Sequence, residues 1–508
     1  MKGQESKLLS TLNEYINFKM ERDKVPGLVV CLIKDSEIVW SNGYGWADVK
    51  QKKPMTKSSI MGVASISKLI TTTAIMQLHE RNMIDINLSI NKYLPFKIQH
   101  PTYPDVEITI SQILNHTSSI SNGPSLWRTY KCNESVISVK EWAREYFVPD
   151  GKFYHQEGNF AKHKPGEGFL YSNAGYGLLA YLVEVVSDQS FNQYCKNNIF
   201  DPLEMNSSSF IIESLEKNNL ATMYSYGYTW ELERDLIQQN VDYDAVIKSD
   251  YFFPLCHYTS PTFGAGGLYS SIEDLSKFLI AIMNNGVFEG KIILSKESLG
   301  KMLSPNVNPS FLPGQFAAFG LGGYAMKLNN GEQVWGHTGA DPGISSYMLF
   351  SPETKIGAIV LANRFVDIRD LIEWLFAEGF TAYWDDSLDK ININWKQYSN
   401  KETNRKITIS VKPNYLPGGS QIFIIGNHQY LGQWVRYGIP LLPQKDGSWQ
   451  KTFSFSDSTK LEFKITRGSW DTEAVNLDGK IPPKFTFIVE KDTVLNIIIE
   501  DWKDLWKD

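Results

Sequence analysis

Apolar and polar positions follow two different periods along most of the chain. The stretch "VPGLVVCLIKDSEIVWSNGYGWAD" holds two alternating apolar runs around a polar turn at residues 34–36, which is typical of two neighbouring β-strands. Residues 65–81 and the stretch "NAGYGLLAYLVEVVSDQSFNQYCKNNIF" instead repeat their apolar positions at helical spacing, which predicts one helix and then two more. Ser271 is placed to cap a further amphipathic helix that ends near Gly286.

Residues 319–364 predict a set of antiparallel strands, because their apolar runs are separated by turn signals at Asn-Asn-Gly and Pro-Glu-Thr. Residues 365–382 have the pattern of a closing helix. Residues 123–168 are aromatic and polar with weak periodicity. We expect that region to be an insertion that shapes a cleft.

From about residue 404 onward the pattern is that of short β-strands alone. The runs "KITISV", "QIFIIG", "KTFSFS", "LEFKIT", "KFTFIVE" and "VLNIIIE" follow one another at short intervals. The preceding residues 386–403 are polar enough to form a linker. We therefore expect two domains, residues 1–385 and residues 404–508, of which the second is a small all-β sandwich.

Composition and charge exclude several classes of function. Of the 508 residues, 42% are hydrophobic and 21% are charged, and the formal net charge is -6. Both signs are interspersed and no basic run could neutralise a phosphate backbone, so nucleic acid is not an expected partner. The N-terminal stretch lacks the apolar core of a signal peptide, and no stretch reaches transmembrane length. We expect a cytoplasmic protein, or an exported one if a leader was removed before residue 1.

Cysteine and histidine give no sign of a disulfide framework or a metal site. Cys31, Cys132, Cys195 and Cys256 are widely separated and form no C-x-x-C pair, so we interpret them as free, mostly buried thiols. The eight histidines are dispersed, without a His-Glu-x-x-His motif. We expect no metal and no cofactor.

A hydroxyl and an amine open the apolar helical run in "GVASISKLITTTA". Ser65 and Lys68 are three residues apart, so on a helix the amine can reach the hydroxyl and accept its proton. Only this serine opens a long apolar helix, whose N-terminus favours negative charge and whose interior lowers the proton affinity of a lysine. The alternative is an N-cap serine beside a lysine that extends to solvent. The spacing alone cannot decide, because it recurs at Ser89, Ser214, Ser298, Ser387 and Ser448.

Two further motifs add weight only in combination with the first. Tyr171 and Asn173 lie just before a helix in "GFLYSNAGYG", and each also has a structural interpretation, as a core tyrosine and a capping asparagine. A His-Thr-Gly triplet occurs once, at residues 337–339, where a lone histidine could equally be structural. The specific observation is the order Ser-x-x-Lys, Tyr-x-Asn, His-Thr-Gly.

Together with "LNHTSSIS", "KPGEGFLYSNAGYGLLAYLVE", "GAGGLYSSIEDLSKFL" and "GHTGADPG", these motifs resemble the serine β-lactamase-like hydrolases. The resemblance covers about residues 20–382 and is to the branch of class C β-lactamases, D-alanyl-D-alanine carboxypeptidases and CubicO-type esterases. It implies an α+β fold of the β-lactamase/transpeptidase type, with an antiparallel sheet flanked by helices and a second, helical lobe. It also implies an acyl-enzyme mechanism at a site between them.

The resemblance assigns a role to each motif residue. Ser65 would be the nucleophile and Lys68 its proton acceptor or electrostatic partner. Tyr171, as phenolate or through a hydrogen bond, would pass the proton to the leaving group and later activate water. Asn173 would hold the lysine amine and the substrate's amide. The substrate-binding strand would be His337, Thr338 and Gly339, and the oxyanion hole would be the backbone N–H groups of Ser65 and Ala340.

One departure from the family pattern changes the expected substrate. Many relatives have Lys-Thr-Gly where this chain has His337-Thr338-Gly339, and a mostly neutral imidazole attracts a substrate carboxylate less than an ammonium does. We therefore expect an esterase or a D-amino-acid peptidase rather than an efficient β-lactamase. The substrate would be a small molecule or a peptide.

The C-terminal segment resembles a different family. "QIFIIGNHQYLGQWV" and "LEFKITRGSWDTEAV" are similar to the starch-binding β-sandwich of amylases, an immunoglobulin-like fold, which makes a glycan a candidate ligand. Trp434, Trp449 and Trp470 could stack on sugar rings, although tryptophans of so small a domain can equally belong to its core. The later sugar-contacting region of that family is replaced here by "NLDGKIPPKF".

Other classes of protein fit less well. An α/β-hydrolase would need a Gly-x-Ser-x-Gly nucleophile turn, which the sequence lacks. "GLGGYA" at residues 320–325 matches a loose dinucleotide fingerprint, but it lies in a hairpin pattern rather than between a strand and a helix. The remaining alternative is a non-catalytic protein of the same fold that binds penicillin, peptidoglycan or another glycan.

Overall fold

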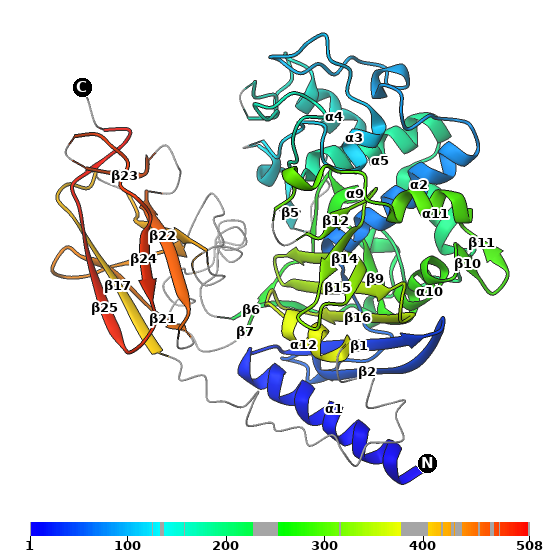
Figure 1. Cartoon of the computed structure of the whole chain (residues 1–508), viewed down its shortest axis with the longest axis horizontal. Helices are drawn as coiled ribbons and strands as arrows, with labels where there is room; N and C mark the ends of the chain where they lie inside the picture. Colours follow the sequence, from blue (N-terminus) through cyan, green and yellow to red (C-terminus); the bar gives the residue numbers. More distant parts are fainter. Residues whose placement is uncertain are drawn as a thin grey trace. The chain divides into compact units, whose positions relative to one another are not determined.

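The computed structural model describes residues 2–123, 125–132, 137–156, 158–226, 252–313, 316–376, 405–417, 420–427, 431, 439–455, 458–467, 472–476 and 478–505. The chain divides into two compact units, one of residues 1–227 and 235–386 and the other of residues 228–234 and 387–508 (Figure 1). The expected linker over residues 386–403 lies outside the described residues.

An antiparallel sheet forms the centre of the first unit. Its strands lie in the order β12-β13-β14-β15-β16-β1-β2-β3, and each neighbouring pair is antiparallel. In β1 both sets of alternating side chains are buried, so both faces at the middle of the sheet are covered. The strands are β1 (Gly27–Lys34), β2 (Glu37–Asp48), β3 (Lys53–Pro54), β12 (Ala318–Phe319), β13 (Tyr324–Lys327), β14 (Gln333–Asp341), β15 (Ile344–Ser351) and β16 (Ile356–Ala362).

Helix α2 (Ser67–Glu80) is the most deeply buried helix of the described first unit, with every residue from Ser67 to Leu78 inside the core. Helices α5, α6, α9 and α11 pack against α2. Helix α10 instead packs on β1 and β16. Helix α1 lies along β2 (Figure 1), and the hydroxyl of Tyr44 on β2 donates to Asn13 Oδ1 on α1. The ring of Tyr15, also on α1, stacks on Trp374 of α12. The other helices are α1 (Lys2–Arg22), α3 (Ile110–Leu114), α4 (Val139–Phe147), α5 (Asn173–Ser187), α6 (Phe191–Cys195), α9 (Phe263–Gly266), α10 (Ile272–Met283), α11 (Lys296–Leu303) and α12 (Arg369–Trp374).

Short paired strands connect the sheet with the helices. The pairs are β4 (Ile60–Gly62) with β9 (Tyr269–Ser271), β5 (Lys131–Cys132) with β8 (Tyr258–Thr259), β6 (Met223–Tyr226) with β7 (Phe252–Leu255), and β10 (Val287–Phe288) with β11 (Lys291–Ile292). Single turns of tighter or wider helix occur at η1 (Ala64–Ile66), η2 (Ile90–Lys92), η3 (Leu126–Thr129), η4 (Lys196–Phe200), η5 (Ile212–Ser214), η6 (Lys217–Asn219) and η7 (Pro309–Phe311).

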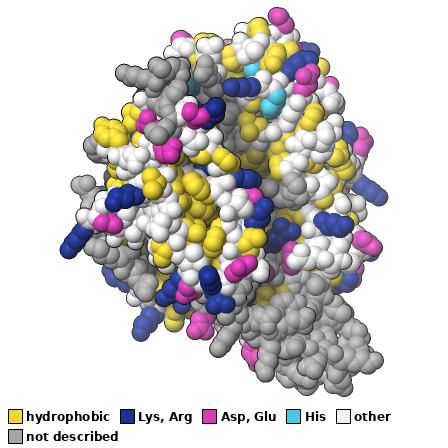
Figure 2. All heavy atoms as spheres, turned by 60° about the vertical axis from the view of Figure 1, so that its left-hand side comes forward, with side chains coloured by type: hydrophobic (Ala, Val, Ile, Leu, Met, Phe, Trp, Pro, Cys, Tyr) yellow, Lys and Arg dark blue, Asp and Glu magenta, His cyan; other side chains and the backbone are white. Residues whose placement is uncertain are grey.

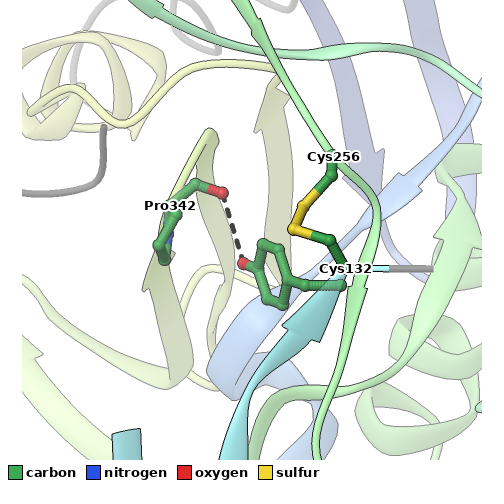
Figure 3. Close-up of a disulfide and its surroundings, with 4 residues drawn as sticks. Cys132, Cys256 and Pro342 are labelled. Atoms are coloured by element: carbon green, nitrogen blue, oxygen red, sulfur yellow. Dashed lines mark hydrogen bonds between the residues drawn. A yellow bond between two sulfur atoms is a disulfide. The ribbon is translucent and has the colours of Figure 1, made fainter. Parts of the chain in front are cut away.

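The cysteines differ from the expectation. Cys132 and Cys256 form a disulfide, so the prediction of free thiols is wrong for this pair, whereas Cys31 and Cys195 are free and buried (Figure 3). The two bonded cysteines are 124 residues apart in the sequence, and only the pairing of β5 with β8 brings them together. A sequence spacing of that length carries no disulfide signal.

Most predicted elements are confirmed, with two corrections. The turn at residues 34–36, the two helices α5 and α6, and the Ser271 cap, which accepts from the Asp274 N–H, are all present. The helix predicted from Ser65 begins two residues later, at Ser67. Within the supposedly irregular residues 123–168 the chain forms α4, whose apolar residues fall at helical spacing and are fully buried. Of the predicted closing helix, Arg369–Trp374 is helical, and residues 377–382 lie outside the described residues.

The second unit is a β-sandwich. Its two sheets have the orders β20-β21-β17-β25 and β19-β18-β22-β24, and β17 runs parallel to β25. Alternating apolar residues of both sheets form its own core, separate from that of the first unit. The strands are β17 (Arg405–Pro413), β18 (Phe423–Gly426), β19 (Ile439–Pro440), β20 (Leu442–Pro443), β21 (Trp449–Phe455), β22 (Lys460–Thr466), β23 (Ala474–Val475), β24 (Phe485–Ile488), β25 (Thr493–Ile499) and β26 (Asp501–Trp502).

Two surface observations bear on possible partners. Among the helices that the structure describes, none combines the length and apolar character needed to cross a membrane. On the face drawn in Figure 2, acidic and basic side chains are intermixed, with hydrophobic side chains between them. That distribution agrees with the absence of basic runs in the sequence.

Candidate active site

Ser65 lies on a tight turn between a strand and a buried helix. Strand β4 ends at Gly62, the turn η1 follows, and α2 begins at Ser67. Ala64 has φ +46°, in the left-handed region that a residue with a Cβ adopts only under constraint. The Ser65 side chain caps neither η1 nor α2, so the alternative interpretation as an N-cap serine does not apply.

The strained turn is held by hydrogen bonds from three directions. The Val63 N–H donates to Leu268 O at 3.0 Å, and the Ser346 hydroxyl donates to Val63 O at 2.7 Å. The Ser67 hydroxyl donates to Ala64 O at 2.6 Å. The backbone around Ser65 is therefore fixed before any substrate arrives.

Lys68 is fully buried, and its amine reaches three oxygens. Its Nζ lies 3.0 Å from Ser65 Oγ, 2.8 Å from Asn173 Oδ1 and 2.6 Å from Ala265 O. Burial lowers the pKa of the Lys68 amine well below its ordinary value, and the nearby charge of Asp341 opposes that shift. Burial therefore favours the neutral form of the amine.

The three contacts also indicate where the lone pair of the neutral amine points. The Asn173 and Ala265 oxygens can only accept, so they take the two N–H donors of a neutral amine. The third direction, toward Ser65 Oγ, is left for the lone pair, which can accept the proton of the Ser65 hydroxyl. This arrangement is that of a nucleophile with its general base.

Asn173 owes its position to the start of α5. The Asn173 N–H donates to Asn122 Oδ1 at 2.7 Å, and the Ser172 hydroxyl accepts from the Gly175 N–H at the same helix end. The capping role that the sequence left open for Asn173 is thus filled by Asn122 and Ser172. The Asn173 side chain is left to contact Lys68.

Tyr171 lies between the nucleophile and the His-Thr-Gly strand. Its hydroxyl is 3.5 Å from His337 Nε2, and the Lys68 amine lies 4.8 Å from its ring centroid. Burial raises the pKa of the Tyr171 phenol well above its ordinary value, while a hydrogen bond with Ser65 opposes this. Burial therefore favours the protonated phenol of Tyr171 in the free protein.

His337 is a buried, neutral imidazole with a defined tautomer. Its Nδ1 lies 2.5 Å from Thr338 O, and because a carbonyl can only accept, the proton belongs on Nδ1. Nε2 then carries a lone pair directed at the Tyr171 hydroxyl. Burial, with the proximity of Lys68, lowers the pKa of His337 to about 3. The ring is therefore a hydrogen-bond acceptor for Tyr171 and no cation.

The remaining predicted residues lie along β14 beside η1. The Thr338 N–H donates to the Tyr324 hydroxyl at 3.1 Å, and the two side-chain hydroxyls are 2.6 Å apart. Gly339 has no room for a side chain, because a Cβ there would lie 2.4 Å from Val63 O and 2.2 Å from Ser346 Oγ. Ala340 follows as an exposed residue of the same strand, next to the turn that carries Ser65.

Several residues of the site were not singled out from the sequence. The Ala265 carbonyl comes from α9, Asn122 caps α5, and Tyr324 holds Thr338. His116 lies 4.4 Å from the Tyr171 ring and its Nδ1 accepts from the Ser172 N–H. His116 occurs within the stretch "LNHTSSIS", which marks it only through the family resemblance.

The structure tests the metal and tryptophan expectations only in part. No cluster of His, Cys, Asp or Glu able to hold a metal ion occurs among the residues that the structure describes. In the second unit, Trp449 is partly buried and packs against the β-sandwich core. Trp434 and Trp470 lie outside the described residues.

Two family models match this chain. Residues 12–379 match the beta-lactamase family model, and residues 404–481 match that of the starch binding domain. Penicillin-binding protein 4* of Bacillus subtilis is 26% identical, over 72% of this chain and 73% of its own length. Protein flp of Staphylococcus aureus is 25% identical over 69% of this chain, and the match spans 62% of its length, less than two thirds.

Solved structures share the fold at lower sequence identity. The octameric penicillin-binding protein homologue from Pyrococcus abyssi is 23% identical, with a TM-score of 0.58 over 90% of this chain and 98% of its own. The D-amino acid amidase from Ochrobactrum anthropi, solved with D-phenylalanine, is also 23% identical, with a TM-score of 0.56 over 70% of this chain and 92% of its own. At these identities the likeness concerns the fold alone.

Lys68→Met and Tyr171→Phe should each lower kcat on p-nitrophenyl acetate by roughly two to four orders of magnitude, because each removes one proton-transfer group. The double variant should lose far less than the product of the two losses, since the groups act as one unit. Steady-state kinetics on all three variants, with circular dichroism to verify folding, measures this. Fully additive losses would contradict a shared network.

The neutral His337 should make the protein less stable in acid. Its pKa is about 3 when folded, against about 6.5 for an unperturbed histidine, so between these values the unfolded chain binds the additional proton. The free energy of unfolding should therefore fall as the pH is lowered through this window, by at most about 1.4 kcal/mol per pH unit from this group.

Urea unfolding of wild type and His337→Gln between pH 4 and 7 measures that contribution as the difference between the two slopes. His155→Gln, a change at an exposed histidine, should keep the wild-type slope. Equal slopes for wild type and His337→Gln would show that His337 titrates alike in the folded and unfolded states.

Proposed function

The chain belongs to the beta-lactamase family, and we propose that it is a serine hydrolase that forms an acyl-enzyme on Ser65. The observation that carries the proposal is the buried Lys68 amine, which is held by Asn173 Oδ1 and Ala265 O and lies 3.0 Å from the Ser65 hydroxyl. A lysine whose pKa is lowered by burial, beside a hydroxyl, is suited to act as a general base.

Acylation would follow from the positions of these groups. Lys68 takes the Ser65 proton as Ser65 Oγ forms a bond to the substrate's carbonyl carbon. The negative charge that develops on the carbonyl oxygen is stabilised by the backbone N–H groups of Ser65 and Ala340. Tyr171 gives its phenolic proton to the leaving group as the ester or amide bond breaks, and the Lys68 ammonium restores a proton to the phenolate.

Deacylation would use the same groups in reverse. A water molecule attacks the acyl carbon, and the Tyr171–Lys68 pair removes its proton. The bond from Ser65 Oγ to carbon then breaks and Ser65 recovers its proton. The net reaction consumes one water and yields a carboxylic acid with an alcohol or an amine.

The substrate we propose is an ester or an amide of the D-amino-acid type rather than a β-lactam. The support is His337, because its neutral ring, held to Thr338 O, offers a substrate carboxylate no positive charge. The D-amino acid amidase among the similar structures shares the fold. The alternative remains a penicillin- or glycan-binding protein of the same fold.

The C-terminal unit supports a second, separate proposal. Residues 404–481 match the starch binding domain model, and we infer that this unit binds a glucan. Of the three tryptophans considered from the sequence, Trp449 is partly exposed on β21, and stacking on a sugar ring would use such a surface. The unit would then hold the hydrolase near its substrate rather than take part in the reaction.

A fluorophosphonate or a penicillin should modify Ser65 alone, because among the residues that the structure describes this hydroxyl is the one paired with the buried Lys68 amine. Intact mass should rise by one adduct, and peptide mapping should place it within residues 62–68. Ser65→Ala should remain unmodified and should not hydrolyse p-nitrophenyl acetate. An adduct on another serine, or turnover that survives in Ser65→Ala, would refute the assignment.

Removing residues 387–508 should separate the two proposed functions. The shortened protein should hydrolyse p-nitrophenyl acetate within several-fold of the wild-type kcat, because the catalytic groups and their core lie in the first unit. The full chain should be retarded by soluble starch in affinity electrophoresis and the shortened one should not. Trp449→Ala, expected to migrate faster than wild type in starch, is the matched variant. Equal migration of full and shortened chains would exclude the glucan proposal.

A further inference from the structure

A cavity of about 530 Å³ lies beside the proposed oxyanion hole. Asp341, which directly follows Ala340, and Gly266 are among its lining residues. A Cβ built on Gly266 would lie 3.7 Å from the carbonyl carbon of Ala64, the residue before Ser65. Two of its lining residues thus neighbour Ala340 and the turn that carries Ser65, whose N–H groups would bind the carbonyl oxygen of a substrate.

One wall of this cavity is aromatic and apolar. Tyr130, Tyr258 and Ile344 line it, and all three pack in one apolar cluster with Ala64. The Tyr130 and Tyr258 ring centroids are 5.6 Å apart, and the Tyr258 hydroxyl donates to Pro342 O at 3.2 Å (Figure 3). This wall suits the apolar part of a substrate.

The disulfide lies next to that wall. Tyr130 precedes Cys132 by two residues, and Tyr258 follows Cys256 by two residues, on the paired strands β5 and β8 (Figure 3). The Cys132–Cys256 bond thus ties together the two segments that carry the rings. It would keep the spacing of the wall constant when a substrate enters.

The charges at the cavity are of one sign. Three of its lining residues, Glu184, Glu213 and Asp341, are acidic, and no lysine or arginine occurs among the lining residues that the structure describes. An acyl group that ends in a carboxylate would be repelled there. The volume is also far larger than a methyl group needs, since pockets of roughly 300 Å³ or more hold drug-sized ligands.

We propose that this cavity binds the acyl group of the substrate and selects bulky acyl groups that carry no carboxylate over both short ones and those that carry one. The inference rests on the proposed acyl-enzyme function, to which it adds the class of acyl donor. Tyr130, Tyr258 and Ile344 determine the preference for size, and the disulfide is the element that positions the two tyrosines.

Three p-nitrophenyl esters test the selection with one leaving group: the acetate, the hexanoate and the mono-adipate, whose chain matches the hexanoate but ends in a carboxylate. Each kcat/KM is first corrected for the rate at which hydroxide hydrolyses that ester without enzyme. The corrected kcat/KM for the hexanoate should then be at least about tenfold higher than the value for the acetate, and higher than the value for the adipate by a similar factor. A hexanoate rate no higher than either of the others overturns the inference. If Ser65→Ala hydrolyses all three like wild type, the proposed function itself has failed.

Variants of the wall link the selection to this cavity. Thr259, which lines it from β8, is changed to Trp to narrow it and to Val to keep its size. Thr259→Trp should lower kcat/KM for the hexanoate about tenfold or more while the acetate stays within about threefold of wild type, and Thr259→Val should resemble wild type. Equal effects of Thr259→Trp on both esters, or none, would place the acyl group elsewhere.

The disulfide and the carboxylates provide two measurements that do not depend on a bulky substitution. The double variant Cys132→Ser/Cys256→Ser should lower the ratio of kcat/KM for the hexanoate to kcat/KM for the acetate. A reductant should lower this ratio in wild type but not in the variant.

The double variant Glu184→Gln/Glu213→Gln should raise kcat/KM for the adipate relative to the hexanoate. Glu204→Gln/Glu216→Gln, at two residues outside the cavity, should not. Unchanged ratios in both sets would overturn the assigned roles of the wall and its charges.

Discussion

The burial of one lysine amine is the constraint on which the rest of the site depends. A charged amine in a dry interior is costly, and a neutral one still requires partners for its N–H groups. α9 supplies the Ala265 carbonyl and the start of α5 supplies Asn173. α2 lies at the centre of the core, and its first turn can bring Lys68 to Ser65 only because the preceding turn is bent through Ala64.

A second consequence of burial is that the hydrogen bonds around the nucleophile join neutral groups. Burial raises the pKa of the Tyr171 phenol further above its ordinary value and lowers the pKa of the His337 imidazole, so both neutral forms are favoured. The hydrogen bond between Tyr171 and His337 therefore depends on which ring nitrogen of His337 carries the proton, and not on a charge. The bond from His337 Nδ1 to Thr338 O places that proton on Nδ1. Such a site discriminates little in favour of anionic substrates, in line with the acidic cavity beside it.

The candidate catalytic side chains could be predicted from the sequence, because their residue types and their spacing within short motifs mark them. Ser65, Lys68, Tyr171, Asn173 and His337 were all candidates from their motifs, and the structure brings them together. The Ala265 carbonyl could not be found, because a backbone oxygen has no residue signature. The pairing of Cys132 with Cys256 depends on strands that meet only in the folded chain, so the sequence interpretation of free thiols was wrong.

The charge state of Lys68 in the free protein tests the central claim most directly. Nuclear magnetic resonance of protein carrying ¹⁵N-labelled lysine reports each Nζ as amine or ammonium, and Lys68→Met identifies the Lys68 signal by its loss. The account predicts that at pH 7 the Lys68 Nζ has the shift of a neutral amine, while exposed lysines have that of an ammonium. An ammonium shift for Lys68 at pH 7 would contradict it, because a protonated amine has no lone pair to accept the Ser65 proton.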